Sequence, residues 1–153
     1  MQVAQRLYEG IEVNGSLEGL ITYMRTDSTR LSNVFLTGAS EMIEADYGKE
    51  YVGSYKMKKD TGAQDAHEAI RPSNLSFKPE EIKEYLSNDQ YKLYKLIYSR
   101  AVAAVMSSAK TNNVTITFDN NGYEFTANGS ELVFDGYLRI YGDYEQVKDE
   151  ILP

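Results

Sequence analysis

Tyr23 and Arg25 are the first side chains whose types and spacing could do chemistry together. They stand in the stretch GLITYMRTDSTRLS, where an apolar run ends and a polar run begins. Residues two apart in an extended chain project to the same side, so Arg25 would lie beside the Tyr23 phenol. A guanidinium there would favour the phenolate and could bind a phosphate through two hydrogen bonds. The pattern fits a tyrosine nucleophile for phosphoryl transfer. A strand residue followed by a solvated turn is the commoner reason for the same residues.

The second candidate site is the stretch QDAHEAIRP, which carries the only histidine of the chain, His67. If residues 65–70 are helical, His67 and Arg71 lie four apart on one helix face. An imidazole and a guanidinium together form a cationic pocket for a phosphate or a pair of proton donors. A polar surface turn is the simpler interpretation of the same stretch, and the residues alone leave both open.

The sequence contains no recognisable metal site. It has no cysteine and no Asp-x-Asp pair, and no other spacing of Asp, Glu and His resembles a set of ligands. We therefore expect no metal ligand within this chain.

Helices are predicted around both motifs. Residues 2–9 are predicted to end a helix at Gly10, and Ser32 and Gly48 are typical boundaries of a second helix. The clearest helix begins after a Ser87 and Gln90 capping box. Its apolar face is expected to pack in the core and contains Tyr91, Tyr94, Ile97, Tyr98, Ala101, Val102 and Val105. A short helix is also expected over residues 78–86, with a proline in its first turn.

Strands are predicted in two places. Asn14-Gly15 is a strong turn signal and should join two short runs that lead into a strand at residues 20–23. After residue 109 apolar and polar residues alternate around Asn121-Gly122 and Asn128-Gly129, which predicts antiparallel strands. About 45 residues of strand are too few for a core of their own. We expect these strands to pair with other chain, or to self-associate through exposed strand edges.

Charge and hydropathy narrow the class of protein. The net charge of −7 is concentrated in residues 112–153, which carry 2 Lys and Arg against 8 Asp and Glu. Residues 1–111 are nearly balanced, with 14 against 15, so a local positive surface for a polyanion is compatible with the sequence. No apolar run is long enough to span a membrane and the first residues do not resemble a signal peptide, so we expect no membrane partner and an intracellular location.

The two motifs together closely resemble the active-site region of bacterial type IA DNA topoisomerase I, in the stretches GLITYMRTDSTRLS and AHEAIRPS. The lead-in QRLYEG and the stretch LVFDGY are also similar to that family, and the resemblance covers essentially the whole chain. Met24 and the run from Glu68 to Pro72 favour this branch over topoisomerase III and reverse gyrase.

The resemblance implies a role for each candidate residue. Tyr23 would cleave single-stranded DNA through a 5′-phosphotyrosyl link, so that a second strand can pass and negative supercoils relax without ATP. Arg25 would position the scissile phosphate, Asp27 would orient its neighbours, and His67 would contact the DNA backbone. Tyr23, Arg25 and His67 are thus the expected catalytic residues, and Arg25, Asp27, His67 and Arg71 the expected DNA-binding residues.

The same resemblance implies that the chain is an α+β piece of a longer enzyme. Residues 1–108 would be a helical gate domain with a short active-site strand, truncated at its N-terminus, and residues 109–153 antiparallel strands from part of the central arch domain. Mg²⁺ would be bound in the full-length enzyme by a Toprim domain, whose acidic motifs this sequence lacks. We expect single-stranded DNA as the partner, a bacterial cytoplasmic, nucleoid-associated location, and no cleavage by this chain alone.

Two other classes of protein remain open at this point. One is a non-catalytic DNA-binding or interaction module of the same fold, and the other is a plain α+β domain in which both motifs are structural. The catalytic interpretation requires an accessible Tyr23 with His67 on the same surface.

Overall fold

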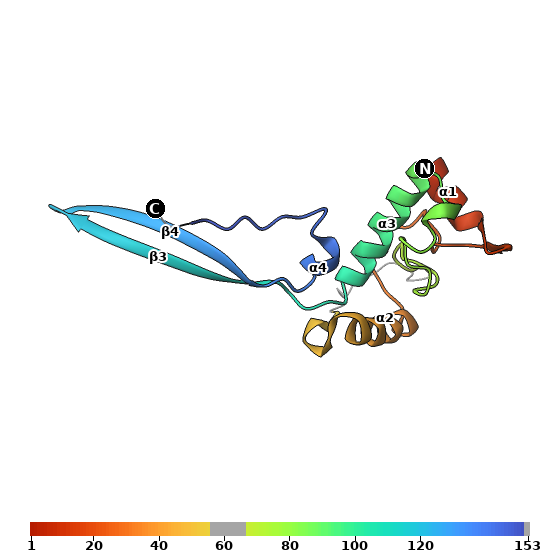
Figure 1. Ribbon diagram of the computed structural model, residues 1–153, viewed down its shortest axis with the longest axis horizontal. Helices are drawn as coiled ribbons and strands as arrows, with labels where there is room; N and C mark the ends of the chain where they lie inside the picture. Colours follow the sequence, from red (N-terminus) through yellow and green to blue (C-terminus); the bar gives the residue numbers. More distant parts are fainter. Residues whose placement is uncertain (56–66, 152–153) are drawn as a thin grey trace.

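The computed structural model describes residues 1–55 and 67–151, and shows a helical part from which a long two-stranded hairpin projects (Figure 1). The helices are α1 (Gln2–Glu9), α2 (Asn33–Tyr47), α3 (Asn88–Ala103) and α4 (Leu138–Tyr141), with 3₁₀ turns at Lys49–Tyr51 and Lys83–Tyr85. The strands are β1 (Ile11–Val13), β2 (Ser16–Glu18), β3 (Lys110–Asn120) and β4 (Tyr123–Phe134), paired as two antiparallel hairpins. The predicted α+β class is confirmed.

The predicted helix ends are confirmed where a cap was present in the sequence. Gly10 ends α1 with a φ of 136°, a backbone angle that glycine adopts without strain. Ser32 Oγ accepts a hydrogen bond from the Phe35 backbone N–H at 3.2 Å and so caps α2. Ser87 and Gln90 form both hydrogen bonds of the capping box on α3.

One hydrophobic core joins α1, α2, α3 and the segment before Tyr23. Its side chains with the least exposure include Leu7, Val13, Leu20, Ile43, Tyr94, Val102 and Val105. Tyr94 and Tyr98 are buried on α3 as predicted, and each hydroxyl donates to a backbone carbonyl. The prediction was wrong for Tyr91, which is only partly buried and whose hydroxyl donates to the Glu80 carboxylate at the surface.

The β3–β4 hairpin turns at Asn121-Gly122, as predicted. Both residues have positive φ angles, 60° and 84°, which a tight hairpin turn requires. The second predicted turn was wrong, because Asn128 and Gly129 lie inside β4 opposite Thr115 and Val114. A turn at residues 121–122 leaves arms of 11 and 12 residues, whereas a turn at 128–129 would leave most of β3 without a partner.

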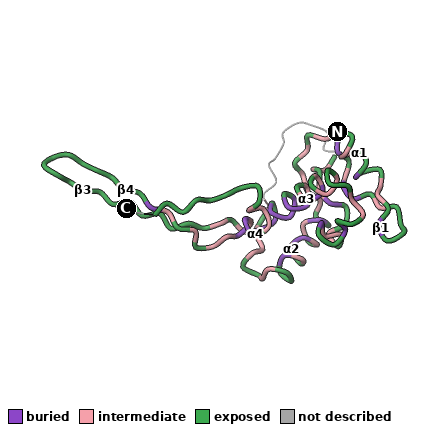
Figure 2. The backbone as a smooth tube through the Cα atoms, turned by 45° about the horizontal axis from the view of Figure 1, so that its top comes forward, coloured by how far each residue is buried: buried purple, intermediate pink, exposed green. Residues whose placement is uncertain are grey.

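The hairpin is exposed over most of its length (Figure 2). Directly paired residues share a face of the ribbon, so Phe118 and Phe125 lie together on one face and Thr117 and Thr126 on the other. The face with the phenylalanines also carries the apolar side chains of Val114, Ile116, Tyr123 and Ala127, together with the polar Asn112, Asn120 and Glu131.

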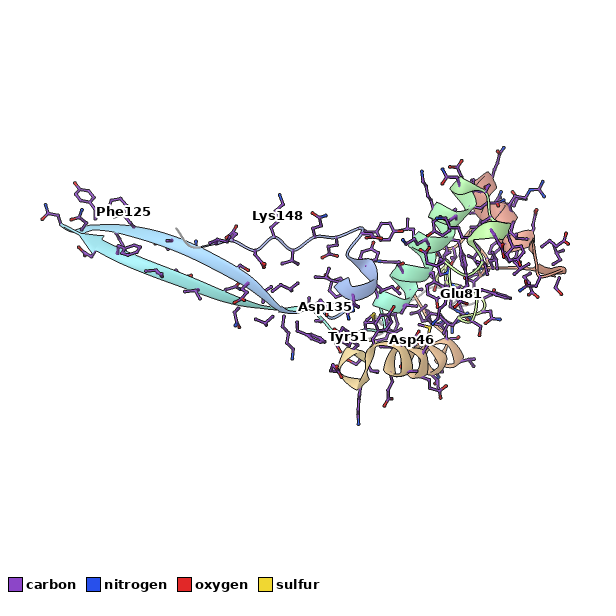
Figure 3. The ribbon with its side chains drawn as sticks, viewed as in Figure 1. Asp46, Tyr51, Glu81, Phe125, Asp135 and Lys148 are labelled. Atoms are coloured by element: carbon purple, nitrogen blue, oxygen red, sulfur yellow. The ribbon has the colours of Figure 1, made fainter. Side chains whose placement is uncertain are left out.

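The base of the hairpin is anchored to the helical part. Tyr51 and Asp135 meet there (Figure 3), where the Tyr51 hydroxyl donates to Asp135 Oδ1 at 2.7 Å. The Tyr51 ring also packs against Phe134 with a centroid distance of 4.9 Å. After β4 the chain returns to α3, because the Tyr137 N–H donates to the Ser107 carbonyl at 2.8 Å and α4 packs on α3.

The predicted strand at residues 20–23 is reduced to one bridge between Ile21 and Pro72. The Thr22 N–H donates to the Arg71 carbonyl at 2.9 Å, and the Ser73 N–H donates to the Leu20 carbonyl at 3.0 Å. The ladder does not extend further, because the two N–H groups that would continue it have other acceptors: the Leu20 N–H donates to the Leu7 carbonyl and the Arg71 N–H donates to Thr22 Oγ1.

Two predicted helices are absent from the described residues. Residues 67–70 are not helical, since the Ala69 N–H donates to the Arg30 carbonyl and its own carbonyl accepts from Thr22. The rest of that predicted helix, residues 65–66, lies outside the described residues. Over residues 78–86 the chain forms turns and the 3₁₀ turn Lys83–Tyr85. Ile82, directly before that 3₁₀ turn, is buried, and Tyr85, three residues later, is partly buried. That spacing suits a 3₁₀ turn, in which residues three apart are aligned.

Candidate active site

Tyr23 follows a segment that the core fixes in place. Leu20 and Ile21 are buried, and the Leu20 N–H donates to the Leu7 carbonyl at 2.8 Å at the end of α1. Gly19 lies so close to this helix that a Cβ there would stand 2.9 Å from the Tyr8 carbonyl oxygen. The phenol of Tyr23 is therefore attached to a rigid backbone, although its own side chain is 41% exposed.

Thr22 holds the two predicted motifs together. Its hydroxyl donates to the Ala69 carbonyl at 2.8 Å and accepts from the Arg71 N–H at 3.0 Å. A single side chain thus satisfies backbone groups of the HEAIRP stretch, which is 47 and 49 residues away in the sequence. Sequence reasoning missed Thr22, and its position directly before the tyrosine was the only available signal.

The rings of Tyr23 and His67 lie on the same surface, as the catalytic interpretation requires. Their centroids are 6.0 Å apart at an interplanar angle of 33°, and His67 is exposed. Tyr8, near the end of α1, packs edge-on against Tyr23, with ring centroids 5.5 Å apart and planes at 70°. Sequence reasoning also missed Tyr8, whose only signal was its place in the QRLYEG stretch.

Arg25 and Asp27 lie in the turn after Tyr23. Met24 is buried, whereas Arg25 and Asp27 are exposed, so Tyr23 and both charged side chains face the solvent. The backbone bends at Thr22, Met24 and Arg25 and does not continue as an extended strand. The turn is fixed locally by two hydrogen bonds, from the Ser28 N–H to Thr26 Oγ1 and from the Arg30 N–H to Ser28 Oγ.

The Arg71 guanidinium is engaged by neighbouring protein groups. Its Nε donates to Glu68 Oε2 at 2.6 Å, and another nitrogen lies 3.4 Å from Ser32 Oγ, which caps α2. The guanidinium carbon also lies 5.0 Å from the centroid of the Phe35 ring. Arg71 therefore links the second motif to the N-terminus of α2.

Burial distinguishes Tyr23 from the core tyrosines. Burial raises the pKa of Tyr94 and Tyr98 well above the ordinary value for a phenol. Their hydroxyls also donate to the carbonyls of Phe77 and Leu75. A nucleophile must lose its proton and reach its substrate, so neither of these side chains can serve as one.

Residues 1–55 and 67–151 contain no group of three or more His, Asp or Glu side chains that could hold a metal ion. The described residues therefore do not form a binding site for the Mg²⁺ that the family resemblance implies.

Within residues 1–55 and 67–151, no helix is both long and apolar enough to cross a membrane.

The family model for DNA topoisomerase matches residues 1–153, and the chain belongs to that family. The resemblance to bacterial type IA DNA topoisomerase I is confirmed by individual relatives.

DNA topoisomerase 1 of Campylobacter jejuni is 44% identical over 156 residues, covering 100% of this chain and 22% of the relative. DNA topoisomerase 1 of Rickettsia bellii is also 44% identical, covering 98% of this chain and 19% of the relative. The full-length topoisomerase I structure from Thermotoga maritima aligns with a TM-score of 0.79 at 38% identity, over 95% of this chain and 23% of that one. The chain thus spans about a fifth of the length of these relatives.

Proposed function

We propose that this chain carries the nucleophile of a type IA DNA topoisomerase and that Tyr23 is the attacking residue. The observation that supports the proposal best is the half-exposed Tyr23 ring, 6.0 Å from the exposed His67 ring. The substrate would be single-stranded DNA, and the reaction would change the topology of a supercoiled molecule.

The proposed chemistry is a reversible phosphoryl transfer. The Tyr23 oxygen loses its proton and bonds to a backbone phosphorus, while the bond from that phosphorus to the 3′ oxygen breaks. The released 3′ oxygen takes up a proton, and the 5′ phosphate stays on the tyrosine. The 3′ hydroxyl reverses the step after strand passage, so no ATP is required.

The charged residues would act on the phosphate. Arg25 is exposed in the turn after Tyr23 and is suited to bind the scissile phosphate and stabilise its developing charge. His67 would contact the adjoining DNA backbone, and Asp27 would orient groups in the turn. Arg71 remains in the DNA-binding motif, and its contacts with Glu68 and Ser32 favour a role in holding that motif in place.

Other proposals follow from membership in a longer protein. We propose that the Mg²⁺ ligands lie in parts of the protein beyond this chain, that the chain alone does not cleave DNA, and that it acts in the bacterial cytoplasm at the nucleoid. Residues 1–108 would form the gate domain and residues 109–153 part of the arch, with α4 returning to the gate side. The exposed β3–β4 hairpin would allow the isolated chain to self-associate through its strand edges.

A chimera tests the catalytic proposal. This chain would replace the matching segment of the Campylobacter jejuni relative, and relaxation of negatively supercoiled plasmid would be measured. Tyr23→Phe should lower relaxation by at least about 10³-fold, since removing an enzyme nucleophile typically costs that or more. Covalent DNA attachment should disappear with it.

The matched control is Tyr144→Phe, which changes a tyrosine of the same 41% exposure far from the site in sequence. Relaxation that survives Tyr23→Phe would refute the nucleophile assignment. A chimera that binds single-stranded DNA but neither cleaves nor relaxes it would favour the alternative, a non-catalytic DNA-binding module.

A further inference from the structure

We propose that Tyr8 is a positioning residue for Tyr23: its ring holds the orientation of the nucleophilic ring. This inference rests on the proposed role of Tyr23. Tyr8 is the next-to-last residue of α1 and lies 15 positions before Tyr23, so the contact between them is tertiary.

The geometry of the ring contact carries the proposal. The two centroids lie 5.5 Å apart with the planes at 70°, an edge-to-face arrangement. Aromatic rings prefer this geometry because the positive edge of one meets the negative face of the other. His67 lies 6.0 Å away with its plane tilted by 33°, so the Tyr23 ring has an aromatic neighbour from each of two other segments.

Both backbones that carry these rings are fixed relative to each other. The Leu7 carbonyl accepts from the Leu20 N–H at 2.8 Å, and Gly19 approaches the Tyr8 carbonyl directly. Leu7 and Leu20 are fully buried, which anchors both segments in the core. A Tyr8 ring on such a frame can restrict the Tyr23 side chain, whereas a ring on a mobile loop could not.

The role belongs to the Tyr8 ring and not to its hydroxyl. No hydrogen bond between described side chains involves the Tyr8 hydroxyl, and Tyr8 is 41% exposed, as is Tyr23. An exposed aromatic ring beside a nucleophile could instead stack on a DNA base. The two roles differ in what they change: orientation alters the cleavage rate on bound DNA, whereas stacking alters the affinity for DNA.

The first experiment uses the chimera and single-turnover cleavage of a single-stranded oligonucleotide. Tyr8→Leu should lower the cleavage rate at saturating DNA by about threefold to tenfold, the effect that one aromatic pair can supply. The dissociation constant for DNA should not change. Tyr8→Phe keeps the ring and should stay within about twofold of the parent.

The matched control is Tyr144→Leu. Tyr144 is also 41% exposed and also pairs with a ring, that of Tyr141, at a centroid distance of 5.2 Å. Its replacement removes a comparable ring pair away from Tyr23 and should leave the cleavage rate unchanged.

The second experiment needs no catalysis. In the 153-residue chain with ¹³C-labelled tyrosine, NMR relaxation would report the order parameter of the Tyr23 ring. Tyr8→Leu should lower that order parameter, and Tyr8→Phe and Tyr144→Leu should not.

The proposal stands only if Tyr8→Leu lowers both the cleavage rate and the order of the Tyr23 ring. An unchanged ring order would overturn it, as would a loss of DNA affinity with an unchanged cleavage rate. If Tyr23→Phe abolishes cleavage while Tyr8→Leu changes neither readout, only this inference fails. If Tyr23→Phe still cleaves DNA, the proposed function fails instead.

Discussion

Hydrogen bonds run in both directions between Thr22 and Arg71, although the two residues are 49 positions apart in the sequence. The Thr22 N–H donates to the Arg71 carbonyl at 2.9 Å, and the Arg71 N–H donates to Thr22 Oγ1 at 3.0 Å. This pair joins the stretch that carries Tyr23 to the stretch that carries His67. The candidate site therefore depends on backbone pairing next to the functional side chains.

Thr22→Val should destabilise the chain, because valine has nearly the same shape but no hydroxyl. The Arg71 N–H and the Ala69 carbonyl would each lose a partner in a partly buried place. Leaving such groups unsatisfied costs about 1–3 kcal/mol, which urea unfolding can measure. Contacts between the rings of Tyr23 and His67 should also weaken in NMR spectra.

Thr37→Val is the control for this change, since Thr37 is exposed on α2. It should stay within about 0.5 kcal/mol of the parent. Equal losses for the two variants would mean that the Thr22 hydroxyl does not hold the motifs together.

Gly19→Ala should destabilise the chain, and Gly38→Ala should not. A Cβ at residue 19 would lie 2.9 Å from the Tyr8 carbonyl oxygen, a backbone atom that cannot move aside without shifting α1. At residue 38, inside α2, a Cβ would meet only Leu75 Cδ1 at the ordinary distance of 3.7 Å.

The expected cost of Gly19→Ala is about 1–3 kcal/mol, the usual cost of overpacking. Gly38→Ala should stabilise the chain by about 0.5–1 kcal/mol, because alanine is the better helix former. Thermal unfolding of the two variants gives the comparison directly. A neutral Gly19→Ala would show that α1 and the Tyr23 segment are not in rigid contact.

Local sequence signals predicted the elements well. The side chains of Ser32 and Ser87 each accept a hydrogen bond from the backbone N–H three residues later and so cap a helix. Asn121-Gly122 supplies the positive φ angles of a turn. Each of these signals acts within a few residues, so it can be recognised without knowing the fold. The accessibility of Tyr23 and its proximity to His67 were expected from the two motifs together.

The errors arose where long-range contacts decide the structure. The predicted strand before Tyr23 is reduced to one bridge because the Leu20 N–H donates to Leu7 of α1 and the Arg71 N–H donates to the Thr22 hydroxyl. Arg71 stays a predicted DNA-binding residue, and its contact with Ser32, which is 39 positions away, had no local signal in the sequence. Tyr8 could not be predicted, because only the close approach of Gly19 to α1 brings its ring to Tyr23.

The contact between Tyr51 and Asp135 should make the base of the hairpin sensitive to alkaline pH. The hydrogen bond to Asp135 is the main cause that raises the pKa of Tyr51 above its ordinary value of 10.0, with burial adding to it. The neutral phenol is the form that donates this bond. Its stabilisation is therefore fully present below pH 10 and is lost as the pH rises through the raised pKa.

The pKa of Tyr51 can be followed from the chemical shift of its ring carbon next to the hydroxyl. We expect its midpoint above 10 in the parent chain and a lower midpoint in Asp135→Asn, which removes the charge that opposes the phenolate. The free energy of unfolding of Tyr51→Phe should change with pH as in the parent chain between about pH 7 and 9. A Tyr51 midpoint that Asp135→Asn does not lower would contradict this account.

Arg25→Ala should reduce both the affinity of the chain for single-stranded DNA and the salt dependence of that affinity. The chain has a net charge of −7, so binding should be weak and should rest on a few local cations. Removing one phosphate contact lowers the slope of log K against log salt by about 0.7 for single strands. Fluorescence anisotropy of a labelled oligonucleotide between about 50 and 200 mM salt measures this slope.

Lys148→Ala removes one exposed cation from the C-terminal segment beside the hairpin (Figure 3) and should leave the slope unchanged. Arg25→Lys should keep the slope of the parent chain, because the positive charge is kept. In the chimera, Arg25→Lys should nevertheless cleave DNA more slowly than the parent, because an ammonium cannot form the paired hydrogen bonds of a guanidinium. That combination would separate attraction of the DNA from positioning of its phosphate. If Lys148→Ala and Arg25→Ala lowered the slope equally, the DNA would be attracted by the overall distribution of charge. Arg25 would then make no specific phosphate contact beside Tyr23.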